Sequence, residues 1–449
     1  MTTDTEKLSH VTILGGGPAG LAIGYYAKKK SVPFTLYEAG EHVGGNARTL
    51  EHRGFLFDTG AHRFHDKDPE ITKEIKELLG EDLKKVDAPS QIFYNGRFID
   101  FPLSPLNLMR NIGVSMCVRA GFELAASKLR NGKLAENFEN FALKNYGRTL
   151  AQAFLLDYSQ KLWGESCQRL SPRIAGNRMK GLNLKTFVKE LLRGSRVKTE
   201  HLDGTFYYPT KGIGMIPEEL GKFCGEKYIR RNARVTRIFH DENKIQAVEI
   251  NGKDRVEVDK VASTLPLPLF IKLLDPSPDK EMIDLARTLR FRNIILVALF
   301  LNKEFVSRNA SVYFPAPNFA FTRVYESKNR SPKMAPKEQT SLVAEIPCSP
   351  EDELWRSEDG RLIEMVSSKL VEIGWIRTEQ VIDSVVKRIS HAYPILEVGF
   401  EEKNSRIFRY LSRFANLKFS GRGGQFRYTH IHELLRMGKE MAEEIKTIA

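Results

Sequence analysis

The strongest constraint on the fold of this 449-residue chain is a glycine-rich segment near its start. Four β-prone residues, Val11–Leu14, are followed directly by the pattern Gly15-x-Gly17-x-x-Gly20. In such a pattern the first glycine permits a tight turn, the second lets backbone N–H groups approach a pyrophosphate, and the third lets the following helix pack close to the strand. The segment therefore predicts a β-α-β unit that binds a dinucleotide.

The residues that follow complete this unit. We expect a helix over about 19–30, with the positive end of its dipole toward the phosphates, and a second strand over 32–37. Glu38 ends that strand, where a carboxylate can accept hydrogen bonds from an adenosine ribose. Because a carboxylate disfavours a 2′-phosphate, the sequence favours FAD or NAD over NADP.

The next segment distinguishes a flavin from a nicotinamide. The pattern Gly44-Gly45-x-x-Arg48 continues from Glu38, and the run Gly-Phe-Leu-Phe-Asp-Thr-Gly-Ala then leads to His62. This arrangement resembles the extended flavin-binding start of amine oxidases, protoporphyrinogen oxidases, phytoene desaturases, Rab GDP-dissociation inhibitors and UDP-galactopyranose mutases. The resemblance implies a Rossmann-like α/β fold that binds FAD, with the Gly-Gly-x-x-Arg piece beside the diphosphate.

The rest of the chain predicts insertions into that flavin fold. The leucine- and alanine-rich sequence between about 103 and 192 indicates helices. Strand-like runs follow within 205–264, with Asn251-Gly252 as a hairpin turn between two of them. Further strand-like runs between 291 and 346 indicate an antiparallel sheet. We expect a discontinuous FAD-binding domain (1–90, 205–268 and 400–449), a helical substrate or cap region (91–204) and an antiparallel-sheet substrate domain (269–399).

Composition excludes several other classes. A hydrophobic fraction of 41% and a charged fraction of 28% are typical of a globular protein. The net charge of +13 suits an anionic ligand. The sequence contains no compact basic run with interleaved aromatic residues, so we expect no nucleic-acid partner. The four cysteines are far apart, and the histidines follow no metal-ligand spacing, so we expect no metal site and a reducing, cytoplasmic compartment. The most apolar run, 294–301, is too short to span a bilayer, so no stable membrane insertion is expected.

Several local sequences resemble one branch of that superfamily, the UDP-galactopyranose mutases, in matching order along the chain. Residues 157–163 resemble the mutases' Tyr-Asn-x-Lys-Val-Trp signature, and 392–394 resemble their Gly-Tyr-Pro. Gly421-Arg422 stands where oxidase relatives usually carry Gly-Asp. The resemblance implies a nucleotide-sugar diphosphate as substrate, and it implies that this substrate is bound by Tyr158, Trp163, Arg178, Tyr208, Tyr393, Arg422 and Tyr428.

The same resemblance implies the catalytic residues and the flavin contacts. His62 belongs to the loop that meets the reactive edge of the isoalloxazine, and Arg178 and Arg422 clamp the leaving diphosphate. These three residues are the expected catalytic ones. The expected flavin contacts are Gly15, Gly17, Gly20, Glu38, Gly44, Gly45, Arg48, His62, Val235 and Gly421.

The implied reaction is an isomerisation in which N5 of reduced FAD acts as the nucleophile and a sugar ring changes between its pyranose and furanose forms. It involves no net redox change. The flavin must nevertheless be reduced first, which implies NAD(P)H or another donor as a transient reductant. The residues give no indication of an oligomeric state.

Two departures from the mutase pattern bear on the substrate. The mutases carry a second phosphate-binding arginine at the end of the strand equivalent to 293–301, where this chain has Leu301, Asn302 and Lys303. Lys303 could supply the charge, although an ammonium is a point donor and not a fork. His432 stands where those mutases have a different polar pair near the flavin.

Two other functions compete with the mutase hypothesis. One is an FAD-dependent oxidoreductase of the protoporphyrinogen oxidase, amine oxidase or desaturase type, whose substrate cavity would be apolar and would lack a diphosphate clamp. The other is a prenyl-protein escort similar to the GDP-dissociation inhibitors, which keep the fold without using a flavin. The intact glycines of the nucleotide-binding pattern argue against the escort.

Overall fold

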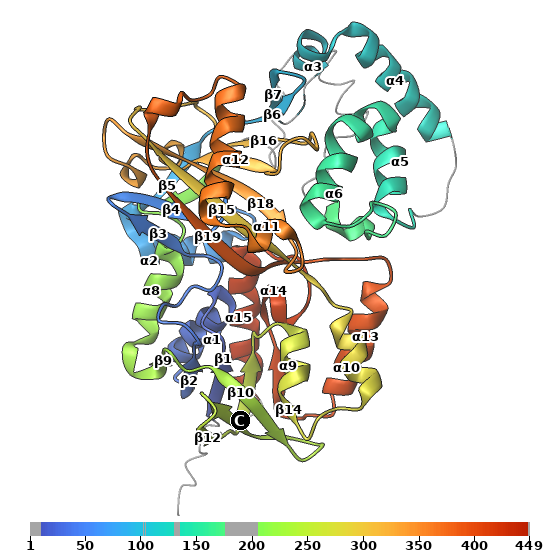
Figure 1. The fold of residues 1–449 in the computed structure, drawn as a ribbon. Helices are drawn as coiled ribbons and strands as arrows, with labels where there is room; N and C mark the ends of the chain where they lie inside the picture. Colours follow the sequence, from blue (N-terminus) through green and yellow to red (C-terminus); the bar gives the residue numbers. More distant parts are fainter. Residues whose placement is uncertain (1–9, 102, 104, 130–134, 176–204, 448–449) are drawn as a thin grey trace, which may run out of the picture.

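A five-stranded parallel sheet is assembled from three distant parts of the chain (Figure 1). The computed structural model describes residues 10–101, 103, 105–129, 135–175 and 205–447. The strand order is β20-β13-β1-β2-β9, and the strands are Val11–Leu14 (β1), Phe34–Tyr37 (β2), Ile229–Arg230 (β9), Lys260–Ser263 (β13) and Leu417–Phe419 (β20). Helix α1 (Pro18–Lys29) joins β1 to β2, which pair in parallel, so the predicted β-α-β unit is confirmed.

Two different layers cover this sheet, because successive side chains of a strand point to opposite faces. Val11 and Ile13 join a core with helices, whereas Leu14 joins a core with a second sheet. The helices on the first side are α1, α2 (Pro69–Leu79), α8 (Met215–Cys224) and α15 (Ile431–Thr447). The second side holds the sheet β12-β11-β10-β14, made of Asp254–Glu257, Ile245–Ile250, Val235–His240 and Leu274–Asp275, with α9 (Leu267–Leu273), α10 (Lys280–Arg287) and α13 (Phe400–Leu411).

A seven-stranded sheet forms the other half of the molecule. Its order is β19-β15-β18-β17-β16-β6-β7, with β19 (Val381–Pro394), β15 (Phe291–Leu301), β18 (Thr340–Cys348), β17 (Arg323–Glu326), β16 (Ser311–Tyr313), β6 (Ser90–Tyr94) and β7 (Arg97–Phe101). The predicted antiparallel pairing of the strands between 291 and 346 is confirmed, and α12 (Asp359–Glu372) packs on the sheet. The β6–β7 hairpin is a correction, since it falls in the region expected to be helical and joins the sheet by parallel pairing with β16.

A group of helices packs beside the seven-stranded sheet (Figure 1). It consists of α3 (Pro105–Ile112), α4 (Val114–Leu129), α5 (Phe138–Ala151), a π-helical turn (Gln152–Leu156) and α6 (Asp157–Trp163), as the leucine- and alanine-rich text predicted. The remaining short elements are β3 (Thr49–His52), β4 (Phe55–Asp58), β5 (Leu83–Asp87), β8 (Thr205–Pro209), α11 (Glu353–Arg356) and α14 (Gly421–Gly424). In the part of the chain that the structure describes, no helix is both long and apolar enough to cross a membrane.

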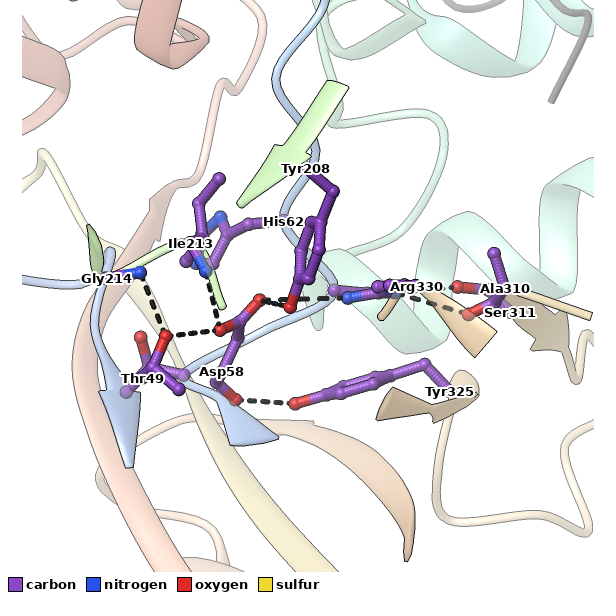
Figure 2. A network of polar contacts seen from close by, with 12 residues as sticks. Thr49, Asp58, His62, Tyr208, Ile213, Gly214, Ala310, Ser311, Tyr325 and Arg330 are labelled. Carbon is purple, nitrogen blue, oxygen red and sulfur yellow. Dashed lines mark hydrogen bonds and ion pairs between the residues drawn. The ribbon is translucent and has the colours of Figure 1, made fainter. Parts of the chain in front are cut away.

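A buried carboxylate joins the two halves at the end of β4 (Figure 2). Asp58 is completely buried, and its Oδ1 accepts hydrogen bonds from the Thr49 hydroxyl (2.7 Å) and the Ile213 N–H (3.0 Å). Its Oδ2 accepts one from the Tyr208 hydroxyl (2.5 Å). Burial raises the pKa of Asp58, and the charge of Arg330 and these hydrogen bonds oppose that shift. The carboxylate thereby connects three segments that are far apart in the sequence.

Strand β17 and the segment that follows it supply the other contacts of Asp58. The guanidinium of Arg330 is fully buried, with Nη1 4.0 Å from Oδ2 of Asp58 and Nη2 donating to residues 310 and 311 at 3.3 Å (Figure 2). The hydroxyl of Tyr325 donates to the carbonyl oxygen of Asp58 at 2.5 Å. Because the turn that ends at His62 begins at Asp58, this network fixes the start of that turn.

Replacing Asp58 by asparagine leaves the Arg330 guanidinium buried without a compensating charge. We expect Asp58→Asn to lower the free energy of unfolding by about 3 kcal/mol, since removal of one partner from a buried pair is strongly destabilising. Urea denaturation followed by circular dichroism measures the loss. The control is Asp284→Asn, whose partner Arg287 is exposed and whose effect should stay below about 1 kcal/mol. Equal losses for the two variants would contradict the role given to Asp58.

Candidate functional site

The glycine turn between β1 and α1 has the geometry that a bound pyrophosphate requires. Gly15 has a φ of +102°, and a Cβ added to Gly20 would lie 1.9 Å from the carbonyl oxygen of Gly15, so only glycine fits at that close approach. The second glycine pair joins the turn, because the N–H of Gly44 donates to the carbonyl of Gly16 at 2.8 Å. A Cβ on Gly45 would lie 3.1 Å from Cα of Gly17. The structure thus brings together five of the six glycines predicted to contact the flavin.

Glu38 lies beside this turn, as the ribose-binding hypothesis requires. Its Oε2 accepts from the N–H of Gly16 (2.7 Å) and its Oε1 from the N–H of Gly40 (2.8 Å). The backbone carbonyl of Glu38 accepts from the N–H of Ala233 (2.8 Å). Val235 is half-buried and begins β10, two residues after Ala233. The Ala233 contact places the start of β10 near Glu38, at the C-terminal end of β2.

Polar atoms without partners line the same region, and they test whether a flavin fits. Nε of Arg48 and the hydroxyl of Ser420 are buried and make no hydrogen bond within the described chain. Ser420 precedes Gly421, whose added Cβ would lie 3.2 Å from Cβ of Ala19 at the start of α1. Buried polar groups in native proteins are nearly always satisfied, so a ligand rich in hydrogen-bonding atoms suits this cradle. The residues present therefore fit a flavin dinucleotide.

His62 ends the turn that begins at Asp58, and its ring is held in one tautomer. Its Nε2 lies 2.8 Å from the carbonyl oxygen of Asn46, which can only accept, so Nε2 carries the proton and Nδ1 is free to accept. Burial and the nearby positive charge of Arg422 lower the pKa of His62 to about 3, and Arg323 adds to this. The imidazole is therefore neutral near pH 7 and acts as a donor at Nε2.

Arg422 lies against two tyrosines that were predicted to bind the substrate with it. From α14 its Nη1 donates to the carbonyl of Ala392 (3.1 Å) and its Nη2 to that of Thr429 (2.6 Å). The guanidinium carbon lies 5.5 Å from the centre of the Tyr393 ring and 4.8 Å from that of Tyr428. The two tyrosine rings stack at 5.9 Å with an interplanar angle of 26°.

Helix α6 contributes the opposite wall of this cluster. The Trp163 ring is buried 5.9 Å from Tyr393, at an interplanar angle of 64°. Tyr158, on the preceding turn of α6, lies 6.0 Å from Tyr313 of β16. Four of the predicted substrate residues, Trp163, Tyr393, Arg422 and Tyr428, are thus in one chain of ring and guanidinium contacts.

The structure adds an ion pair that the sequence did not reveal. Arg323 of β17 donates from Nε to Oε2 of Glu345 (2.8 Å) and from Nη2 to Oε1 (2.8 Å), with side-chain exposures of only 12% and 4%. The same Oε1 accepts from the N–H of Ala61 at 2.7 Å, immediately before His62. This pair therefore fixes the end of the His62 turn, while Asp58 fixes its start.

Arg323 is also a second guanidinium in the aromatic cluster. Burial alone would lower the pKa of Arg323, but the carboxylate of Glu345 raises it, helped by nearby Tyr393, Tyr313 and Tyr158. Burial raises the pKa of Tyr393, the charge of Glu345 and nearby Tyr428 raise it further, and the charges of Arg323 and Arg422 oppose the shift. Tyr393 accordingly lies within the influence of two cations.

The suggestion that Lys303 supplies the second charge of the clamp is wrong. Strand β15 begins beside the cluster, where Arg292 pairs with Tyr393, and it ends nine residues later at Leu301. At a rise of about 3.3 Å per residue, Lys303 lies about 30 Å or more along the strand from Tyr393. The second arginine whose charge acts on Tyr393 is Arg323.

Glu345 carried a signal that sequence reasoning missed. It interrupts the apolar run Leu-Val-Ala-Glu-Ile at the centre of β18, a strand that is buried along its whole length. A carboxylate in such a strand needs a buried partner, because an unpaired charge there is very costly. The identity of that partner depends on the pairing of β17 with β18, in which Arg323 lies opposite Glu345.

One predicted substrate residue, Tyr208, lies outside this cluster. Tyr208 is only 1% exposed, and its hydroxyl donates a hydrogen bond to Asp58. Its ring therefore lies in the core, where it helps to fix the start of the His62 turn. A substrate contact by Tyr208 stays a prediction. Arg178 lies outside the residues that the structure describes.

Three histidines lie near one end of the cluster. The rings of His430 and His432 stack at 5.7 Å, and His65 lies 5.3 Å from His430. Tyr428 makes an edge contact with His430 at 5.4 Å. Burial lowers the pKa of His432. Among the described residues no three histidine, cysteine, aspartate or glutamate side chains are arranged to hold a metal ion.

Comparisons with known proteins agree with a flavin site. The family model described as flavin containing amine oxidoreductase matches residues 18–425. A crystal structure of reduced UDP-galactopyranose mutase is similar in fold, with a TM-score of 0.87 at 19% identity over 98% of this chain and 96% of that one. In sequence, coproporphyrinogen III oxidase of Bacillus subtilis is 22% identical over 434 residues, covering 89% of this chain and 90% of that protein.

A plant relative matches over a shorter region. Protoporphyrinogen oxidase 1 of Arabidopsis thaliana chloroplasts is 24% identical over 299 residues, covering 61% of this chain and 55% of that protein. This match therefore spans about half the length of the plant protein. The family model, in contrast, covers most of the chain, and the residues of the cradle fit the group that its members bind. The protein belongs to the flavin-containing amine oxidoreductase family.

Proposed function

We propose that this chain is an FAD-dependent nucleotide-sugar mutase that interconverts pyranose and furanose rings, as UDP-galactopyranose mutase does by its name. The observation that carries the proposal is the pair of guanidinium groups of Arg323 and Arg422. The charges of both lower the pKa values of Tyr393 and His62, so both lie near these two side chains. Two arginines among stacked tyrosines suit an anion with two phosphates, since guanidinium groups bind phosphate oxygens through paired hydrogen bonds.

The proposed chemistry assigns the protein a binding and orienting role. When bound and reduced, by NAD(P)H or another donor, FAD supplies the nucleophilic nitrogen. Arg323 and Arg422 stabilise the negative charge that builds on the diphosphate as it leaves, in a partly buried site where such interactions are stronger than in water. Glu345 uses Nε and Nη2 of Arg323, so the leaving group would approach Nη1. Trp163 and the tyrosines provide flat walls that exclude water.

His62 has a distinct part in this proposal. Its neutral ring donates from Nε2 to the Asn46 carbonyl, which fixes the turn beside the flavin cradle. Because the turn is held at Ala61 by Glu345 and at Asp58 by the Tyr208 hydroxyl, its backbone keeps one position against the substrate. The ring orients the turn, and it does not need to carry a positive charge to do so.

A second candidate is an FAD-dependent oxidoreductase that acts on a porphyrinogen. It is supported by the sequence relatives, which include coproporphyrinogen III oxidase of Bacillus subtilis over 90% of its length. Coproporphyrinogen carries carboxylate groups, and arginines can bind carboxylates by the same paired hydrogen bonds. The reaction, and not anion binding alone, therefore distinguishes the two candidates.

The proposed reaction can be tested without knowing the physiological donor. Enzyme reduced by dithionite and incubated anaerobically with UDP-galactopyranose should yield the furanose isomer, detected by chromatography. The matched arm incubates oxidised enzyme with coproporphyrinogen in air. Porphyrin formation with no furanose from any nucleotide sugar would reject the mutase and favour the oxidoreductase.

Arg422 can be tested by ligand binding alone. We expect Arg422→Ala to weaken UDP binding to the reduced flavoprotein about 10- to 100-fold, which corresponds to the loss of one charge-assisted hydrogen-bond set of about 1.5–3 kcal/mol. Titration of the flavin absorbance with UDP gives the dissociation constant. The control is Arg427→Ala, an exposed arginine in the same segment, which should bind UDP as the parent does. Equal weakening in both variants would contradict a clamp at Arg422.

The neutral state of His62 predicts a pH dependence of stability. Its folded pKa of about 3 lies below the ordinary value of 6.5, so the unfolded chain binds the proton first as the pH falls. The parent protein should therefore lose stability relative to His62→Gln between pH 6.5 and about 3, and this difference should be constant above pH 6.5. Urea midpoints measured across pH 4–8 check this. A difference that does not change with pH would contradict the neutral imidazole.

A further inference from the structure

Lys161 makes a set of contacts that the proposed chemistry does not use. It lies on α6 between Tyr158 and Trp163, which form one wall of the aromatic cluster. Its Nζ points into a ring of backbone carbonyls from a single segment of the chain. The acceptors are Phe314 (2.6 Å), Ala316 (2.8 Å), Phe319 (3.0 Å) and Phe321 (3.1 Å).

The segment 314–321 is the loop of the β16–β17 hairpin, which forms another part of the cluster. Tyr313 precedes the loop and pairs with Arg323, which follows it. The ring of Tyr313 also lies 6.0 Å from that of Tyr158 on α6. The lysine therefore connects the wall that carries Trp163 to the hairpin that carries the second guanidinium.

An ammonium suits this position better than other side chains. The loop turns its carbonyl groups toward one point, and a compact charge with three donors can serve several acceptors around a point, which a planar guanidinium cannot. Burial lowers the pKa of Lys161 to about 7, with Asp157 opposing the shift. Burial thus works against the charged form, and the carbonyl ring offsets that cost.

A second cation binds the same end of α6 through the backbone. Arg292 of β15 donates from Nε to the carbonyl of Leu162 (3.3 Å), and its Nη1 donates to the Ser349 hydroxyl (2.6 Å) and to Asp352 (3.1 Å). This cation fixes the C-terminal end of the helix to the long strands of the sheet. The Lys161 ammonium is the group on α6 that donates to the carbonyls of the hairpin loop in the described contacts.

We propose that Lys161 is a positioning residue that sets the distance between α6 and the β16–β17 hairpin, and with it the affinity of the cleft for the nucleotide diphosphate. The affinity part of this inference rests on the proposed function. The geometric part concerns only the protein. Lys161 holds Tyr158 against Tyr313 and keeps the helix that carries Trp163 beside the hairpin that carries Arg323, so that the aromatic walls and the second guanidinium reach the same ligand.

Lys328 provides a matched control. Its side chain is also buried, and its Nζ also donates to a ring of backbone carbonyls, those of Glu304 (3.4 Å), Pro336 (3.2 Å), Lys337 and Gln339 (2.9 Å). Lys328 comes just after the C-terminal end of β17, where Glu326 pairs with Leu342 of β18. Arg323 lies at the opposite end of β17. Lys328→Met therefore removes a comparable set of ammonium-to-carbonyl hydrogen bonds, and none of them involves α6.

The test compares parent, Lys161→Met and Lys328→Met as flavin-loaded proteins. We expect amide hydrogen exchange in both α6 and the 314–321 loop to rise in Lys161→Met and to stay at the parent level in Lys328→Met. Titration of the flavin absorbance with UDP should show about tenfold weaker binding for Lys161→Met, and parent-like binding for Lys328→Met. In turnover, KM should rise more than kcat falls, since the His62 turn and Arg422 are unchanged.

The outcomes separate the two proposals. A parent protein that binds no UDP overturns the proposed function, and the exchange measurement then still decides whether Lys161 fixes the cleft. Unchanged exchange in α6 and the loop of Lys161→Met overturns the positioning role. Equal loss of UDP affinity in both lysine variants also overturns it, because a general loss of stability would then explain the effect.

Discussion

The turn from Asp58 to His62 is held between two buried carboxylates, and the remainder of the site depends on this arrangement. Asp58 accepts hydrogen bonds from the Tyr208 hydroxyl and from the 49 and 213 segments, while Glu345 accepts from the Ala61 N–H and from Arg323. Buried carboxylates are tolerated only with such donors, since an unpaired charge in the interior is very costly. Glu345 and Arg323 belong to the seven-stranded sheet, whereas Tyr208, Thr49 and Ile213 come from other segments, so the turn connects these parts in one hydrogen-bonded unit.

This arrangement also sets the local charge. Arg422, Arg323 and Arg330 all lower the pKa of His62, and the only nearby carboxylates are already paired with arginines or hydrogen-bond donors in the described chain. Arg323 and Arg330 are neutralised by Glu345 and Asp58, whereas Arg422 donates to carbonyl oxygens in the described chain and keeps its charge beside the aromatic rings. A site of this kind suits a ligand that is flat in one part and anionic in another. The same fold serves several chemistries, so the side chains on it, and not the fold, distinguish a mutase from an oxidoreductase.

Local chemistry made parts of the site predictable from the sequence. The glycine turn, Glu38 and Gly44-Gly45 are close in sequence, and their spacing directly fixes which backbone groups meet. The tyrosines and Arg422 were identified by resemblance, and the structure brings Tyr393, Tyr428 and Arg422 together. The β6–β7 hairpin was missed because its short strands directly precede a sequence that is typical of helices. Pairing with β16, which is distant in the sequence, stabilises these strands.

The Lys303 hypothesis failed for a related reason. The sequence showed a long apolar strand and a cation just beyond it, but it did not show which end of the strand lies beside Tyr393. A strand of eleven residues separates its ends by more than the reach of any side chain. Arg323 and Glu345 are 22 residues apart, and only the register of β17 against β18 places them opposite each other.

The sequence by itself determined the nucleotide-binding turn, because strand, glycines, helix and carboxylate follow one another within a span of fewer than 30 residues and interact through the local backbone. Only the tertiary structure decided the second guanidinium, its Glu345 partner and the carbonyl ring around Lys161. These depend on the pairing of strands and on the packing of α6 against a distant hairpin. Such contacts join residues whose separation along the chain carries no information about their separation in space.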